Sequence, residues 1–113
     1  MIEHGEIYTG EQVYDYMLKY HNPKPEKLFI ELWKDWEYKY LKDFDISLVA
    51  IMRNNFSLPW HKEKLVQPIL VHRFYGKGDY LFYISDGNHR VAYANSVGIK
   101  KLPAFVLLKK SNE

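Results

Sequence analysis

The segment Ser85-Asp86-Gly87-Asn88-His89-Arg90 decides how this sequence is interpreted. Residues 80–85 lead into it with a run of β-branched and aromatic side chains, which predicts a strand. After it, small apolar residues follow at helical spacing, and Gly98 predicts the end of that helix. The segment is therefore expected to form the turn at which a strand passes into a helix.

Such a turn has the chemistry of an anion site. A helix N-terminus presents N–H groups without intrahelical partners, together with a partial positive charge. Gly87 would let a ligand approach the backbone, and His89 and Arg90 would add hydrogen-bond donors suited to a phosphate. Asp86 could cap the helix or hold a metal ion or a hydroxyl group. The alternative is an ordinary turn and helix cap, which leaves the two cations unexplained because they oppose the helix dipole.

The first part of the chain predicts two helices. Thr9 and Gln12 have the form of a capping box, so a helix is expected over residues 10–20, and the prolines of segment 22–25 end it. A second helix is expected over residues 25–42. Its apolar residues recur at steps of three and four: Leu28, Phe29, Leu32, Trp33, Trp36 and Tyr40.

The remaining chain predicts a small sheet. Residues 46–51 predict a short strand, alone or followed by one helical turn. An irregular loop is expected over 53–60, a helical turn over 62–66, and a hairpin loop at 76–79. The hairpin strands are expected over 69–74 and 80–85, and a last strand over 103–108. This order predicts one α+β domain over residues 1–113, with a helical N-terminal extension (1–42) and a core (43–108).

Composition and charge exclude several classes of protein. The 113 residues are 47% hydrophobic and 27% charged, which is typical of a globular domain. The chain has no cysteine, so disulfides, thiolate chemistry and sulfur-ligated zinc are excluded, and no histidine spacing indicates a metal site. The net charge of +2 is too small to indicate a nucleic-acid binder by itself. Neither a signal peptide nor a membrane span is visible, so a cytoplasmic protein is expected.

Residues 67–105 resemble the ParB/sulfiredoxin superfamily. The matching pattern is Gln67-Pro68-Ile69 before a strand, a hairpin, the segment Asp86-Gly87-Asn88-His89-Arg90, a helix of small residues with Gly98-Ile99, and a final strand. The resemblance covers about residues 44–108, whereas the first forty residues match no family. It implies a single-domain relative with a small mixed sheet and flanking helices.

The resemblance implies a phosphate pocket lined by Gly87, Asn88, His89 and Arg90. In this superfamily the loop and helix start bind ATP or ADP in the kinase-like and sulfiredoxin branches, and CTP in the partition proteins. Those nucleotides, with Mg²⁺, are therefore the candidate ligands. Asn88 stands where the kinase-like motif has histidine, where sulfiredoxin has its nucleophilic cysteine, and where the partition proteins have glutamate. Without a cysteine, sulfinic-acid repair is excluded. The partition proteins also have a helix-turn-helix domain, which is not expected here.

A catalytic role would also need a general base within reach of the reacting group. The candidates are Asp86, His89, His61 and Glu63. In the kinase-like branch a glutamate before the Pro-Ile strand does this work, and Glu63 is the nearest acidic residue by order; the alternative for Glu63 is a solvated loop charge. The remaining histidines are expected to be surface or satisfied residues: His4, His21 and His72.

Three functions stay open at this stage. The first is a nucleotide-binding enzyme that transfers a phosphoryl group or hydrolyses a phosphate ester. The second is a nucleic-acid-binding or nuclease module, which the scattered lysines support only weakly. The third is a protein-interaction domain that docks through its aromatic N-terminal helices and keeps a vestigial pocket. The aromatic content of 17% fits a core, a partner surface or a base-stacking platform.

Overall fold

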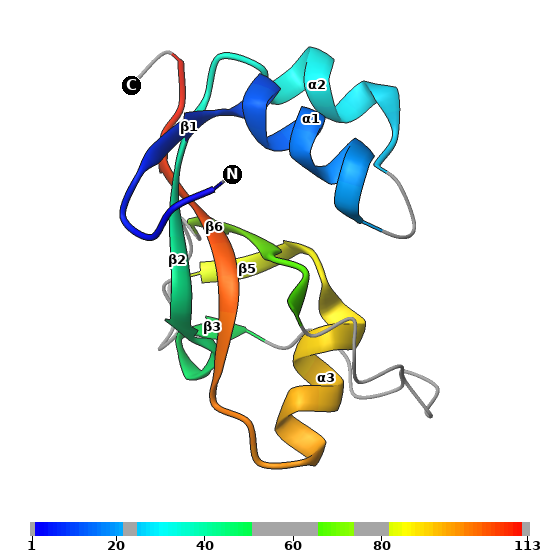
Figure 1. The fold of residues 1–113 in the computed structure, drawn as a ribbon, viewed down its shortest axis with the longest axis vertical. Helices are drawn as coiled ribbons and strands as arrows, with labels where there is room; N and C mark the ends of the chain where they lie inside the picture. The colour runs from blue at the N-terminus through cyan, green and yellow to red at the C-terminus, as the bar shows by residue number, and fades with distance from the viewer. Residues whose placement is uncertain (1, 22–24, 51–65, 74–81, 112–113) are drawn as a thin grey trace.

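The computed structural model describes residues 2–21, 25–50, 66–73 and 82–111. Within these ranges it contains a six-stranded sheet with the order β1-β2-β6-β4-β5-β3 (Figure 1). The elements in chain order are β1 (Ile7–Thr9), α1 (Gly10–Tyr20), α2 (Lys27–Trp33), β2 (Glu37–Asp45), a 3₁₀ turn η1 (Ile46–Leu48), β3 (Val49–Ala50), β4 (Ile69–Arg73), β5 (Phe82–Asp86), α3 (Asn88–Ser96) and β6 (Lys101–Lys109). The loops expected at 53–60 and 76–79 lie outside the described residues, as does all but the last residue of the turn expected at 62–66.

Helices cover both faces of the sheet. Ile69 and Val71 of β4 lie in one buried cluster with Val91 of α3. Leu70, between them in the sequence, lies in a second buried cluster with Val13 of α1. Because successive side chains of a strand point to opposite faces, α1 and α3 cover opposite faces of the sheet (Figure 1).

The expected α+β fold class is confirmed. β4 pairs in parallel with β6, and β3 pairs in parallel with β5. The pairs β1–β2, β2–β6 and β4–β5 are antiparallel, so the sheet is mixed. Two helices, α1 and α2, precede most of the strands and lie together at one end of the molecule (Figure 1).

Helix α1 begins and ends where the sequence predicted. The Thr9 hydroxyl accepts a hydrogen bond from the Gln12 N–H (3.2 Å), and the Gln12 side chain accepts one from the Thr9 N–H (2.8 Å), so the capping box is formed. The Gly10 N–H donates to the carbonyl of Trp36 (2.7 Å). A Cβ at Gly10 would collide with the carbonyl oxygen of Trp33. The glycine therefore lets α1 start directly against the end of α2.

The prediction of a helix over residues 25–42 was wrong in its second half. Helix α2 ends at Trp33, and residues 37–45 form β2, which pairs with β1 and β6. Trp36, Tyr38 and Tyr40 also alternate with polar residues at the period of a strand, and aromatic side chains favour strands. Positions 36 and 40 are four apart, which fits both periods. The expected boundary between residues 42 and 43 consequently falls inside β2.

The other strands differ from expectation mainly at their ends. Residues 46–50 form a 3₁₀ turn followed by the two-residue strand β3, rather than a strand followed by a turn. β4 and β5 lie where strands were expected, and β6 extends two residues further in the N-terminal direction. Gly98, with a φ of +81°, follows the end of α3 as predicted. β1 was missed because its three residues are too few to show a pattern.

The helices of the described part are short, with 11, 7 and 9 residues. A helix that crosses a bilayer needs about 20 consecutive apolar residues. Within the described residues, none combines the length and the apolar character required to span a membrane.

His72 of β4 lies in a buried aromatic box. The walls of this box are Trp33, Trp36, Tyr38 and Tyr83, whose ring centroids lie 4.8–5.7 Å from the imidazole centroid. His72 Nε2 is hydrogen-bonded to the Tyr38 hydroxyl (2.8 Å), and Nδ1 lies 3.4 Å from the Tyr83 hydroxyl. Burial, with a smaller effect from the charge of Lys110, lowers the pKa of His72 to about 4. His72 is thus a satisfied, neutral histidine, as expected.

Candidate functional site

The turn between β5 and α3 depends on Gly87. This residue has φ +110° and ψ 21°, in the left-handed region that side chains other than glycine rarely adopt. A Cβ at this position would lie 2.5 Å from Cγ2 of Ile69 and 2.9 Å from its Cβ. Both the backbone conformation and the close approach to β4 therefore require glycine, and the chain can turn sharply from Asp86 into the helix.

Helix α3 begins without a side-chain cap. Gly87 occupies the N-cap position, and the first hydrogen bond of the helix runs from the Val91 N–H to the Gly87 carbonyl (3.1 Å). The N–H groups of the first helical residues precede that bond, and such groups have no carbonyl partner within an α-helix. These groups, with the positive end of the helix dipole, favour a negative charge at this corner.

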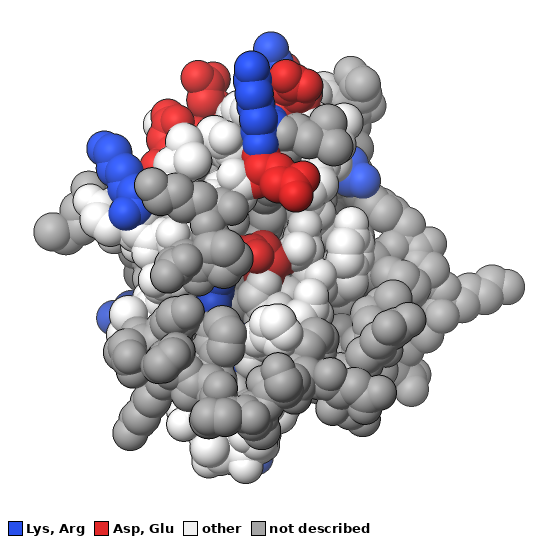
Figure 2. Space-filling model, turned by 90° about the vertical axis from the view of Figure 1, so that its right-hand side faces the viewer, with Lys and Arg blue, Asp and Glu red and all other residues white. Residues whose placement is uncertain are grey.

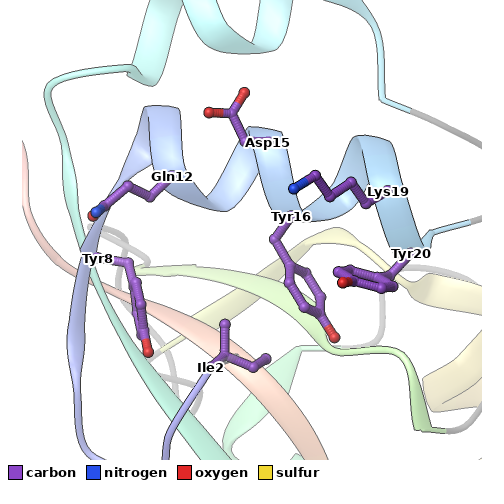
Figure 3. A pocket seen from close by; sticks show the side chains of 7 residues that line it. All are labelled: Ile2, Tyr8, Gln12, Asp15, Tyr16, Lys19 and Tyr20. Carbon is purple, nitrogen blue, oxygen red and sulfur yellow. The ribbon is translucent and has the colours of Figure 1, made fainter.

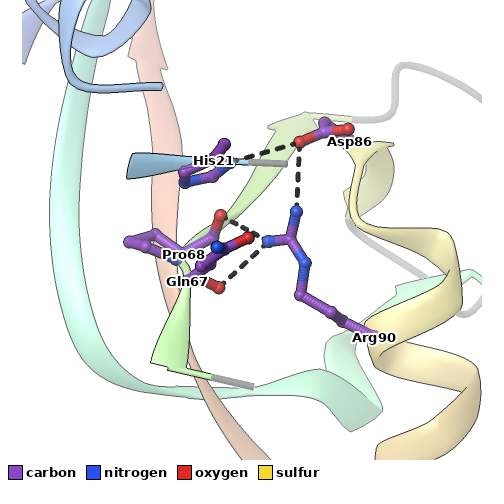
Figure 4. Close-up of polar contacts among 5 residues, drawn as sticks. All are labelled: His21, Gln67, Pro68, Asp86 and Arg90. Carbon is purple, nitrogen blue, oxygen red and sulfur yellow. Dashed lines mark hydrogen bonds and ion pairs between the residues drawn. The ribbon is translucent and has the colours of Figure 1, made fainter. Parts of the chain in front are cut away.

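Arg90 is buried at this corner, with only 4% of its surface exposed. Its Nη1 donates hydrogen bonds to the carbonyls of Gln67 (3.0 Å) and Pro68 (2.7 Å), which lead into β4 (Figure 4). Its Nη2 lies 3.4 Å from the Asp86 carboxylate. Burial lowers the pKa of Arg90, and the neighbouring Asp86 opposes that effect. The guanidinium therefore ties α3 to β4 and β5; its predicted contact with a phosphate stays a prediction.

Asp86 lies between two cationic or potentially cationic groups. One is Arg90; the other is His21, whose Nδ1 is 3.7 Å from the same carboxylate oxygen (Figure 4). Burial raises the pKa of Asp86, but the contact with His21 and the charge of Arg90 outweigh burial, so the pKa lies below its ordinary value. The carboxylate is therefore held in its charged form and much of its charge is balanced locally.

His21 was expected to be a surface or satisfied histidine, which was wrong, and sequence reasoning did not count it among the site residues. It follows the last residue of α1, and its side chain is only 1% exposed. Among the described residues, neither ring nitrogen has a hydrogen-bond partner, although Asp86 lies nearby. An unpaired buried imidazole is uncommon, because burying a polar group without a partner costs free energy. The sequence indicates only that His21 follows the end of a well-capped helix. The contact between His21 and Asp86 forms only when the chain folds.

The other predicted site residues have different positions. Asn88 is half-buried and His89 is exposed, and both belong to the first turn of α3, next to the uncapped N-H groups. Glu63 and His61 lie outside the described residues. The described part of the site thus brings together Asp86, Gly87, Asn88, His89 and Arg90, and adds His21.

Charges on the described surface are mixed in sign. Figure 2 shows one face of the molecule, on which described acidic and basic side chains lie beside one another, mostly towards the top. In the described ranges, no three His, Asp or Glu side chains are grouped so that they could hold a metal ion. A nucleic-acid interface normally concentrates lysine and arginine on one face, and the described side chains in this view show no such concentration. The corner at Gly87 presents the start of a helix, a position whose N–H groups are hydrogen-bond donors of the kind that bind small anions.

Comparisons with known proteins found similarity to a solved structure but to no family model. No protein-family model matches the chain, and the comparison with curated proteins found no match. A similar solved structure is the C-terminally truncated chromosome-partitioning protein ParB from Caulobacter crescentus complexed with CTP-gamma-S, with a TM-score of 0.40 and 21% identity. The match covers 57% of this chain and 42% of that one, which is less than half of its length.

Proposed function

We propose that this chain binds the phosphate groups of a nucleotide, or of another phosphorylated small molecule, at the turn between β5 and α3. One observation carries the proposal: α3 begins at Gly87 without a side-chain cap, so the N–H groups of its first turn lie at the positive end of a helix with no side chain of the cap residue bonded to them. A glycine at the N-cap also leaves room for a ligand to approach the backbone. The resemblance of residues 85–90 to the phosphate-binding segment of the ParB/sulfiredoxin superfamily supports the same assignment.

The nearby carboxylate does not contradict an anion site. Asp86 is 3.4 Å from the Arg90 guanidinium and 3.7 Å from the His21 imidazole. The positive charge of the Arg90 guanidinium at this distance cancels much of the field of Asp86 that a phosphate would experience. Arg90 then acts as a positioning residue, because it fixes the segment that carries the N–H groups, while Asn88 and His89 would contact the ligand.

The ligands proposed are ATP, ADP or CTP. Mg²⁺ binds proteins through one or two carboxylates together with the phosphates of a substrate. Asp86 is a carboxylate directly before the proposed phosphate site, but the described residues hold no cluster of three ligating side chains. Mg²⁺ would therefore arrive with the nucleotide and be held mainly by its phosphates.

A reaction at this site would be phosphoryl transfer or the hydrolysis of a phosphate ester. Such catalysis consists largely of positioning phosphates and neutralising charge, which backbone N–H groups and His89 would do. Asp86, His89 and Glu63 are the proposed acid–base residues. Ligand binding is tested first, because turnover requires that the substrate binds.

The test is a thermal-unfolding panel with ATP, ADP, CTP and inorganic tripolyphosphate, each with and without Mg²⁺. A ligand present at one hundred times its Kd stabilises the folded state by about 2.7 kcal/mol, which raises the Tm of a domain of this size by roughly 10 °C. We expect at least one nucleotide and tripolyphosphate to raise the Tm. If none of them does so, the proposal is wrong.

Two asparagines of α3 provide a matched pair of variants. Asn88→Asp places a negative charge at the first helical position, where it opposes a phosphate but favours the helix dipole by about 0.3–1 kcal/mol. Without ligand this variant should therefore be at least as stable as the wild type, while its response to nucleotides is lost. Asn95→Asp adds the same charge at an exposed position in the last turn and should retain the response. Equal responses of the two variants would contradict the proposal.

A further inference from the structure

A hollow of about 760 Å³ lies between α1 and the amino-terminal segment (Figure 3). This volume lies within the range of sites that bind small molecules. The hollow is lined by Ile2, Tyr8, Gln12, Asp15, Tyr16, Lys19 and Tyr20. All seven residues belong to the part of the chain that precedes the resemblance to the ParB/sulfiredoxin superfamily, so that resemblance implies nothing about this hollow.

Two tyrosines form an aromatic wall of the hollow. The rings of Tyr16 and Tyr20 have centroids 4.7 Å apart and are tilted by 42°. The Tyr16 ring packs edge-on against Phe105 of β6, with ring centroids 5.7 Å apart. Tyr20 has 58% of its surface exposed. Figure 3 shows both rings, with Tyr8, on the same side of α1. The wall thus combines a ring packed against the sheet, Tyr16, and an exposed ring, Tyr20.

The remaining residues suit a planar heterocycle. Tyr8 is held by an edge-on contact with Phe105 (6.1 Å) and by a hydrogen bond that its hydroxyl accepts from the Glu3 N–H (3.0 Å). Gln12, Asp15 and Lys19 supply an amide, a carboxylate and an ammonium group at the rim. Aromatic faces with a few polar groups at their edge are the usual means of binding a base.

The aromatic wall adjoins the candidate phosphate site. The Tyr16 ring centroid is 5.9 Å from that of His21, and His21 Nδ1 is 3.7 Å from the Asp86 carboxylate. Tyr20 directly precedes His21 in the sequence. A single imidazole therefore separates the tyrosines from the β5–α3 corner.

We propose that the hollow binds the base of the nucleotide whose phosphates lie at the β5–α3 corner, with the base stacked on Tyr20 and Tyr16. This inference rests on the proposed function, which it extends by assigning the nucleoside part of the ligand to the N-terminal helices. Stacking on an aromatic side chain strengthens base binding about tenfold or more and depends little on which base is present. ATP and CTP should therefore both bind more tightly than tripolyphosphate.

The experiment compares the Kd of ATP, CTP and inorganic tripolyphosphate by titration calorimetry, for the wild type and two variants. Tyr20→Leu removes the exposed ring of the wall. Tyr14→Leu removes a tyrosine on the other side of the same helix, outside the hollow, and is the matched control. We expect Tyr20→Leu to weaken ATP and CTP about tenfold and to leave tripolyphosphate unchanged. Tyr14→Leu should bind all three like the wild type.

The outcomes separate the two proposals. If neither nucleotides nor tripolyphosphate bind, the proposed function fails, and this inference fails with it. If tripolyphosphate binds as tightly as ATP and CTP, or if Tyr20→Leu leaves ATP and CTP unchanged, only the inference about the base is overturned. The same conclusion follows if Tyr20→Leu and Tyr14→Leu weaken the nucleotides equally, because the effect is then not located in the hollow.

Discussion

Acidification should destabilise this protein through His72. The imidazole is 1% exposed and enclosed by the aromatic box, and its pKa in the folded protein is about 4. In the unfolded chain a histidine has a pKa near 6.5. The folded state therefore takes up this proton less readily than the unfolded state. The contribution of the neutral His72 to the free energy of unfolding is fully present above about pH 6.5 and is lost as the pH falls towards 4.

The magnitude follows from the two pKa values. One pKa unit corresponds to about 1.36 kcal/mol, so the full loss between pH 6.5 and pH 4 is about 3 kcal/mol, with about 2 kcal/mol already lost at pH 5. This is a large part of the stability of a small domain, which is about 5–15 kcal/mol. Acid unfolding should therefore begin well above the range in which carboxylates titrate.

Urea denaturation of the wild type at several pH values between 7.5 and 4.5 measures this loss directly. His72→Gln removes the titrating group. This variant should be less stable than the wild type at pH 7.5, because the hydrogen bond to Tyr38 is altered. Its free energy of unfolding should change less with pH than that of the wild type. His4→Gln, which replaces a half-exposed histidine outside the aromatic box, is the control. Parallel profiles for the wild type and His72→Gln would refute the reasoning.

Three further predictions concern the corner and the first helix. Gly87→Ala should lower the free energy of unfolding, measured in urea, by about 1–3 kcal/mol, because Gly87 has a φ of +110° and contacts β4 closely. Gly98→Ala is the control and should lower it less, because Gly98 has a φ of +81° but open space around it. Arg90→Ala should cost about 2 kcal/mol by leaving buried carbonyls unpaired, and Arg90→Lys should recover only part of the loss in the same measurement. Thr9→Ala removes the cap of α1 and should lower the stability by about 1 kcal/mol in thermal unfolding, whereas Thr9→Ser should not.

Local signals in the sequence were enough to predict part of this fold. The capping box of α1 connects residues three apart, so Thr9 and Gln12 fix the start of the helix without help from the rest of the chain. The turn at Gly87 is equally local, because the left-handed conformation belongs to the residue itself. β4, β5 and α3 around it were therefore predicted close to their observed positions.

The features that were missed depend on distant parts of the chain. Trp36 and Tyr40 fit both a helical and a strand period, and the pairing of β2 with β6 decides between them. His21 lies beside Asp86 only because α1 packs on the sheet. The burial of Arg90 likewise depends on the carbonyls before β4. A single sequence shows the residue types at such places but not which groups meet.

The position of β6 has a consequence for how the chain acquires its structure. β6 lies between β2 and β4, and it is the last strand in the sequence. During synthesis, no strand of the described ranges connects the ribbon β1–β2 with the ribbon of β4, β5 and β3 until residues 101–109 leave the ribosome. Pairings between segments so far apart in sequence form slowly. The nascent protein therefore carries two open sheet edges, those of β2 and β4, until its final strand joins them.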